Sequence, residues 1–315
     1  MKYIILSLCF FVSQLVSGQG ITNDPSINLS KVSIQSTMDG VVQPLYYYKS
    51  TAKKSKPLVV QLHSWSYSAD SLKTVGLDFE AISKDYNYIF PNFRGINNHI
   101  KACCSDFVIS DIDQAIDWAI KNMKVDKKQI YIVGYSGGGF ATFAMYMKSR
   151  HKIKAFSAWV PIGDLESWYK ESLERRNKYS REIISCTTET GTFDPLKARE
   201  RSPQFWVTPV KKRKKSIIQI FAGIHDGYTG PVPISQSANF YNKLLTDYEV
   251  KDSSLYVSAK DLDYMLKNQN FTDSNVLKLG DKKIHYQRKS GNISLTIFEG
   301  GHDMLSEVVF DSFNK

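Results

Sequence analysis

Residues 130–140 read IYIVGYSGGGF, a short β-branched and aromatic run followed by closely spaced glycines. The run at 130–133 predicts a strand that is buried on both faces within a parallel sheet. Residues 140–148 have the composition of a helix. The segment therefore predicts a strand, a sharp turn and a helix in direct succession.

The turn carries the pattern Gly-x-Ser-x-Gly as Gly134, Ser136 and Gly138. In this arrangement a tight turn lifts the serine above the sheet edge, and its neighbours must be small because the chain has no room for side chains. The amide of Gly137 should lie at the start of the helix, where negative charge is stabilised. We therefore expect Ser136 to be a nucleophile and Gly137 to supply an oxyanion donor.

Strands and helices alternate on both sides of this turn. Asp39 and Gly40 separate two alternating runs, at 27–34 and 41–48, which predicts an antiparallel hairpin at the start of the sheet. Further strands are predicted at 57–63, 86–92, 153–161, 216–222 and 294–298. This alternation favours an α/β fold with a mostly parallel central sheet and helices on both faces.

The first residues are typical of a secretory signal, with an early lysine, an apolar run and small residues at the end. We expect a signal peptide at 1–18 and one catalytic domain over 19–315, in a protein that is secreted or periplasmic. Within the domain, 165–209 is polar, basic and helix-biased, which favours a lid or cap over the site or plain inserted helices. Residues 248–290 are predicted only as an insertion. No other stretch predicts a stable membrane span.

The formal charge of the chain is +10, and much of it lies in basic runs at 175–176, 197–201 and 211–215. Such runs are most often solvated faces. A sharper interpretation is a surface that attracts an anionic polysaccharide. An exported protein has no use for a nuclear signal, so we predict no nucleic-acid partner.

Three cysteines remain after loss of the signal, namely Cys103, Cys104 and Cys186. Neighbouring cysteines rarely bridge each other, so a disulfide from Cys186 to either Cys103 or Cys104 is one option and free thiols are another. A zinc site that uses these cysteines with His99 fits no usual ligand spacing. We predict no metal and no cofactor.

A serine nucleophile needs a base within hydrogen-bond reach and an acid that orients the base. Asp226 and His302 each follow a predicted core strand directly. The chain order Ser136, Asp226, His302 is the order of α/β-hydrolases. Asp252 and Asp303 compete with Asp226, but neither follows a strand as directly. We predict Ser136, Asp226 and His302 as the catalytic residues.

Two other histidines are weaker candidates for the base. His225 is adjacent to the predicted acid, and His63 ends the strand whose loop should line the oxyanion site, so His63 is assigned a structural role. This loop should also supply the second oxyanion donor. We favour the backbone amide of Trp65, with the hydroxyl of Tyr67 as the alternative.

The chain resembles α/β-hydrolases of the prolyl-oligopeptidase and dienelactone-hydrolase-like group, which includes secreted carbohydrate esterases. The most specific matches are the Ser136 turn, Asp226 with Val232-Pro233, and Gly300-Gly301-His302. The resemblance assigns Ser136, Asp226 and His302 to the triad. The chain differs in two respects, because it has no room for a β-propeller and has His63-Ser64 where the group usually has His-Gly.

The leading functional hypothesis is a secreted serine esterase that removes acetyl, feruloyl or methyl esters from a polysaccharide. The main alternative is a serine peptidase of the same fold, and a third hypothesis is a non-catalytic glycan-binding protein. Aromatic side chains near the site could stack on sugar rings. The predicted substrate contacts are Tyr67, Tyr135, Trp159 and Trp168, with Trp65 and Trp206 as further aromatic candidates.

Overall fold

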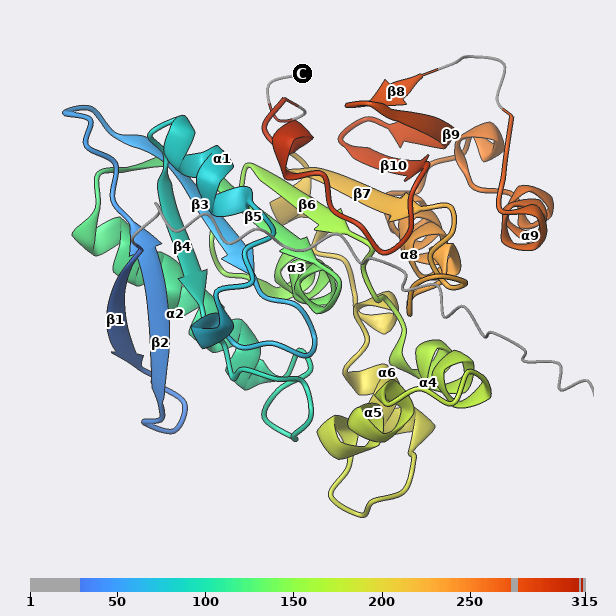
Figure 1. The fold of residues 1–315 in the computed structure, drawn as a ribbon, viewed down its shortest axis with the longest axis horizontal. Coiled ribbons are helices and arrows are strands. Elements are labelled where there is room, and N and C mark those ends of the chain that lie inside the picture. The colour runs from blue at the N-terminus through green and yellow to red at the C-terminus, as the bar shows by residue number, and fades with distance from the viewer. Residues whose placement is uncertain (1–28, 273–276, 312, 314–315) are drawn as a thin grey trace, which may run out of the picture.

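The computed structural model describes residues 29–272, 277–311 and 313. In this part of the chain the strands form one ten-stranded sheet in the order β1-β2-β4-β3-β5-β6-β7-β10-β9-β8. Neighbouring strands from β4 to β10 run parallel, and the strands at both edges are antiparallel. Helices cover the sheet on both faces (Figure 1). The predicted α/β-hydrolase architecture is therefore confirmed, while the predicted signal at 1–18 lies outside the described residues.

The bounds of the elements follow the predicted alternation. The strands are β1 (Ser30–Gln35), β2 (Val42–Tyr48), β3 (Lys56–Leu62), β4 (Asn87–Pro91), β5 (Val125–Tyr135), β6 (Ala155–Trp159), β7 (Ile217–Gly223), β8 (Lys278–Leu279), β9 (Lys282–Ser290) and β10 (Ile293–Phe298). The helices are α1 (Leu77–Ser83), α2 (Asp106–Asn122), α3 (Gly137–Lys148), α4 (Leu165–Glu174), α5 (Tyr179–Thr187), α6 (Pro195–Glu200), α7 (Val210–Arg213), α8 (Ile234–Asp247) and α9 (Ala259–Asn268). Short 3-10 turns lie at η1 (Ala69–Ser71), η2 (Pro203–Phe205), η3 (Ser253–Leu255) and η4 (Ser306–Val308). Each helix of the described residues falls short of what a membrane crossing requires in length and apolar character.

The central strand β5 shows why the sheet is covered on both sides. Ile130 and Ile132 pack into the larger core with α2, α3 and α8, whereas Tyr131 and Val133 pack into the second core with α1 and the C-terminal segment. Alternate side chains of a strand point to opposite faces, so a run that is apolar at every position must be buried on both. The continuous apolar run of β5 therefore places it at the centre of the domain.

The segment 248–290 is more than an insertion, because its last part is strand β9. This strand pairs antiparallel with β10 and extends the sheet beyond the parallel strands. Lys282, Lys283, Arg288 and Lys289 hide the strand pattern in the sequence. Charged side chains are typical of strands near a sheet edge, where they discourage pairing with other molecules.

The segment predicted as a lid or cap contains α4, α5 and α6, which form a helical group outside the sheet (Figure 1). A disulfide joins Cys186 in α5 to Cys103, while Cys104 is a buried free thiol. Trp168 of α4 donates its indole N–H to the carbonyl of Pro231 at 2.9 Å and stacks edge-on against Trp65. These contacts fix the helical group to the segments that follow β3, β4 and β7.

Glu171 on α4 makes the stability of this region depend on pH. Burial raises the pKa of Glu171 from about 4.5 to about 7, so the native state keeps a proton that the unfolded chain releases. Stability should therefore fall as pH rises from about 4.5 to about 7. We expect Glu171→Gln to stabilise the protein by about 2 kcal/mol at pH 8 and to have little effect at pH 4. Urea unfolding at both pH values measures this, and the exposed Glu174→Gln on the same helix is the matched control. Equal effects of the two variants at pH 8 would contradict the prediction.

Candidate active site

The nucleophile turn forms as predicted between β5 and α3. Ser136 has a φ of 58°, a backbone conformation that is strained for a residue with a side chain. A Cβ on Gly138 would overlap the carbonyl oxygen of Leu62, and a Cβ on Gly134 would overlap the carbonyl oxygen of Gly138. Only glycine fits at these two positions, so the glycines allow the turn to project the serine at the carboxyl edge of the sheet.

Three side chains from distant loops form one hydrogen-bond chain at this edge. The Nε2 atom of His302 lies 2.8 Å from the Ser136 Oγ, and the Nδ1 atom of His302 lies 2.7 Å from the Asp226 Oδ2. Ser136 follows β5, Asp226 follows β7 and His302 follows β10, so the parallel strands deliver all three to the same end. With the proton of the imidazole on Nδ1, the Nε2 atom can accept the serine proton.

Asp226 is held in a fixed orientation by the backbone around it. It is 1% exposed, and its Oδ1 accepts hydrogen bonds from the amides of Gly227 at 2.9 Å and Val232 at 3.1 Å. A Cβ on Gly230 would overlap the Asp226 carboxylate and approach the Cβ of His302. Gly230 was not identified from the sequence, although its position between Asp226 and the Val232-Pro233 pair was a signal that could have found it.

Tyr135, the residue before Ser136, supports the loop that carries His302. Its hydroxyl donates a hydrogen bond of 2.7 Å to the backbone carbonyl of His302, and the two rings lie 5.1 Å apart. Burial raises the pKa of this phenol, so the hydroxyl stays protonated and able to donate. Tyr135 was predicted to contact substrate, and the structure places it as a neighbour of His302.

We expect Tyr135→Phe to lower kcat about fivefold with little change in KM, because the variant keeps the ring and loses one hydrogen bond that positions His302. Tyr131→Phe is the matched control. The Tyr131 hydroxyl donates to Gln129 at 3.1 Å in the same strand and does not hydrogen-bond to Ser136, Asp226 or His302 in the described structure. Steady-state kinetics on one ester substrate compares them, and equal kcat values for the two variants would exclude this positioning role.

The predicted oxyanion donors lie against each other. A Cβ on Gly137 would overlap the backbone nitrogen of Trp65, so the two backbones are in close contact. Gly137 is the first residue of α3, where amides have no acceptor within the helix. No protein acceptor for the Trp65 amide is found among the described residues. The indole N–H of Trp65 donates to Glu182 of α5 at 2.8 Å, a contact that could not be predicted from the sequence.

The predicted tryptophan contacts with substrate are wrong for two residues. Trp159 is fully buried, stacks on Phe221 and donates to Ser157. Trp168 is 1% exposed and packs within the helical group. Their faces are covered by other side chains, so they belong to the core.

Two other predicted aromatic residues are more accessible. Tyr67 is 40% exposed, and the ammonium group of Lys73 lies over its ring. Trp206 is partly buried and donates to the carbonyl of Glu200. Of the predicted aromatic contacts, Tyr67 offers the most open ring.

The alternative bases and acids are engaged elsewhere. His63 is buried between the carbonyl of Asn92, 2.6 Å away, and the stacked ring of Phe93, and burial lowers the pKa of this imidazole. The Nε2 atom of His225 lies 2.7 Å from a carboxylate oxygen of Glu299.

The competing aspartates cap local turns. Asp303 accepts the amide of Gly301 at 2.8 Å, and Asp252 accepts the amide of Ser254 at 2.9 Å. Neither hydrogen-bonds to the His302 ring in the described structure.

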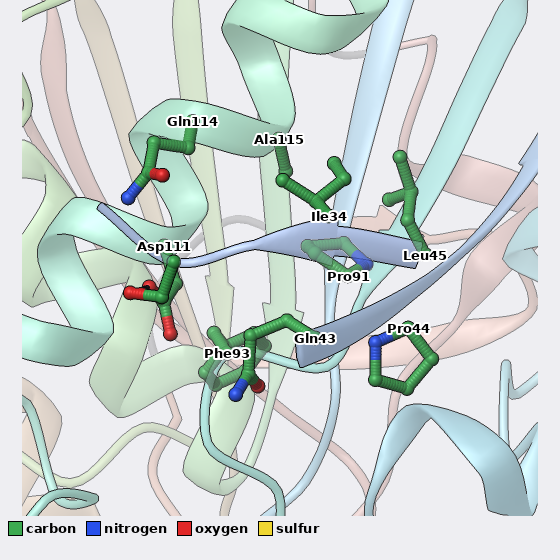
Figure 2. Close-up of a pocket in the computed structure, with 10 residues that line it drawn as sticks. Ile34, Gln43, Pro44, Leu45, Pro91, Phe93, Asp111, Gln114 and Ala115 are labelled. Carbon is green, nitrogen blue, oxygen red and sulfur yellow. Dashed lines mark hydrogen bonds between the residues drawn. The ribbon is translucent and has the colours of Figure 1, made fainter. Parts of the chain in front are cut away.

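A separate cavity lies beneath the N-terminal hairpin, between β1, β2, β4 and α2. Figure 2 shows that apolar side chains such as Ile34, Leu45 and Ala115 surround it, with Asp111 on one side. Its volume is about 10 Å³, roughly the space of one water molecule. It contains no triad residue and is too small for an organic substrate, so we treat it as a packing defect.

Solved structures with the same fold include several peptidases. They are the acylaminoacyl peptidase of Pyrococcus horikoshii (17% identity, TM-score 0.54), a puromycin-hydrolyzing peptidase of Mycobacterium tuberculosis (18%, 0.53) and prolyl oligopeptidase B of Galerina marginata (17%, 0.53). Each match covers 70% of this chain but only 31–35% of the other protein. The chain thus spans about a third of the length of these proteins, and the likeness shows the shared fold.

The family comparison extends beyond the fold. Residues 74–274 match the model of the prolyl oligopeptidase family, a region that includes Ser136 and Asp226, whereas His302 lies beyond it. The match covers more than half of the chain, and the predicted family resemblance is confirmed. The chain belongs to the prolyl oligopeptidase family.

Proposed function

We propose that Ser136, His302 and Asp226 form the catalytic triad and that the reaction passes through an acyl-enzyme. His302 removes the proton from Ser136 as the serine attacks a carbonyl carbon, and then delivers this proton to the leaving group. Water repeats the sequence and releases the acid. The observation that carries this proposal is the unbroken hydrogen-bond chain from Ser136 through His302 to the buried Asp226.

The amides of Gly137 and Trp65 are proposed to bind the oxyanion. Their backbones lie in contact beside Ser136, and two donors aimed at one point stabilise the charge of a tetrahedral intermediate. The hydrogen bond from Trp65 to Glu182 supports this role, because it ties the loop after β3 to α5. Ser64 precedes Trp65 where related proteins usually have glycine, and it leaves the contact between Trp65 and Gly137 intact.

The proposed substrate is a carboxylic ester on a carbohydrate, as an acetyl, feruloyl or methyl ester. The exposed ring of Tyr67 supports a sugar substrate, since aromatic faces pack against sugar rings. A peptidase activity is favoured at least as strongly by the family and by the names of the similar structures. Both reactions use the same triad, so only the substrate distinguishes them.

Parallel assays on one preparation separate the two. Esterase substrates are acetylated, feruloylated and methyl-esterified polysaccharides, and peptidase substrates are aminoacyl and prolyl arylamides. We expect kcat/KM for the best ester to exceed that for the best arylamide by about 100-fold or more. Faster cleavage of an arylamide would reverse the assignment to a peptidase. Small activated esters do not decide the question, because serine peptidases also hydrolyse them.

We also propose that the protein is exported and acts outside the cytoplasm. The disulfide between Cys103 and Cys186 supports this, because disulfides persist in oxidising compartments. Mass spectrometry of the mature protein should find an N-terminus near Gln19 and the two cysteines linked. A cytoplasmic protein that keeps its first residues and has reduced thiols would contradict export.

A further inference from the structure

The two ends of the parallel strands differ in function. We call the side of the sheet where these strands begin the amino edge and the side where they end the carboxyl edge. The parallel strands from β4 to β10 all begin at one edge and end at the other, and the triad follows the carboxyl ends. The segments that lead into β3, β4, β5, β6 and β7 therefore lie at the amino edge, at the opposite ends of these strands from the loops that follow them (Figure 1). At about 3.3 Å per residue, a strand of five to seven residues separates the two edges by about 20 Å.

The amino edge collects lysines from five separate segments. All of them are exposed, and we call this surface the lysine face. Its members are Lys53, Lys54, Lys84, Lys121, Lys124, Lys127, Lys128, Lys152, Lys154, Lys211, Lys212, Lys214 and Lys215. The sequence shows only one of these groups as a conspicuous run, since the others are brought together by the fold.

The lysines of this face outnumber the carboxylates beside them. No lysine of this face forms an ion pair with another described residue. Acids at the same edge are committed to local contacts. Asp126 accepts hydrogen bonds from the Lys128 amide and the Gln129 side chain, and Asp117 pairs with Arg150. The face therefore presents a net positive field to solvent.

Several arginines of the basic runs do not add to this surface. Within the 211–215 run, the guanidinium group of Arg213 is buried and donates to the carbonyls of Met145, Tyr146 and Ser149 at the end of α3. In the 197–201 run, Arg199 pairs with Glu166. Most of the positive charge without an ion-pair partner thus comes from lysines near the starts of strands.

We propose that the lysine face binds an acidic polysaccharide and holds the enzyme on this polymer with the triad facing away from it. Ammonium groups are compact, strongly hydrated charges, which suits a polymer that is bound through its charge density rather than through a fixed geometry. The large apolar side chains that are exposed in the described residues all lie outside the five segments of the face. Without apolar anchors, the face suits a hydrated polymer better than a lipid bilayer.

The test compares two variants of equal charge. One carries Lys127→Glu, Lys128→Glu, Lys214→Glu and Lys215→Glu on the lysine face. The matched control carries four exposed lysines changed to glutamate on α9, β8 and β9, at Lys260, Lys267, Lys278 and Lys283. The probe is polygalacturonate, with unsubstituted xylan as the neutral polymer.

We expect the wild-type protein to bind polygalacturonate but not xylan, with Kd rising about tenfold or more between about 50 and 200 mM salt. The face variant should lose about tenfold or more in affinity at low salt, and the control less than about threefold. Equal losses of affinity in the two variants would show that the net charge of the protein, and not the lysine face, causes the binding. Tighter binding of duplex DNA or of phosphatidylglycerol vesicles than of polygalacturonate would overturn the choice of partner.

Two controls separate this proposal from the catalytic one. Turnover of a small aryl ester should be the same in both charge variants, which shows that they fold. Polygalacturonate binding should survive Ser136→Ala, since the triad lies at the other edge of the sheet. Loss of binding in Ser136→Ala would contradict a separate surface, whereas absence of ester hydrolysis in a protein that binds would contradict only the proposed reaction.

Discussion

Ser136→Ala should reduce turnover by about 10³-fold or more, whichever substrate class proves correct. The variant keeps the fold of the turn, because alanine removes only the hydroxyl that lies 2.8 Å from His302. It also removes the atom that forms the acyl-enzyme, so the residual rate comes only from the remaining binding and oxyanion groups. Steady-state kinetics on the best ester or arylamide measures the loss.

Covalent labelling tests the same residue without any assumption about substrate. A fluorophosphonate should react with wild-type protein when the Ser136 oxygen displaces fluoride from phosphorus, and mass spectrometry should locate the adduct on Ser136. Ser66→Ala is the matched control, since Ser66 lies in the neighbouring loop and its hydroxyl contacts Lys178 instead of the triad. Equal labelling of Ser136→Ala would identify another nucleophile. Failure of the wild type to label or turn over any substrate would favour the non-catalytic glycan-binding hypothesis.

The parts of the fold that could be predicted are those with a local cause. The apolar run of β5 must be buried on both faces, and the glycines around Ser136 permit only one kind of turn. Asp39-Gly40 likewise defines the hairpin between β1 and β2. The three triad loops could be found because each directly follows a strong core strand.

Features that depend on contacts between distant segments could not be predicted. Trp159 and Trp168 resemble substrate-binding aromatics in the sequence, and only packing against other rings shows that they are core residues. Strand β9 is hidden by its charged residues, and the contact between Trp65 and Glu182 joins residues that lie 117 positions apart. The lysine face is of the same kind, because its five segments share one edge of the sheet and only one of them is a conspicuous run in the sequence.

Asp226→Asn should lower kcat by about 10³- to 10⁴-fold, close to the effect of removing the nucleophile. The Oδ1 atom of Asp226 accepts two backbone amides, from Gly227 and Val232, and its Oδ2 accepts from His302. An asparagine that keeps its oxygen on the backbone amides must turn its NH₂ group toward the Nδ1 atom of His302. The imidazole would then carry its proton on Nε2, facing Ser136, and could not accept the serine proton.

Asp303→Asn is the matched control for this mechanism. Asp303 is adjacent to His302 in the chain, but within the described residues its Oδ2 accepts only the amide of Gly301, which an asparagine oxygen can also accept. We expect this variant to lose less than about threefold in kcat. Urea denaturation should show that both variants are folded. If Asp303→Asn instead caused the larger loss, the acid would be misassigned. The contrast tests tautomer control directly, because both substitutions remove one negative charge near the imidazole and only one of them reverses a hydrogen bond to it.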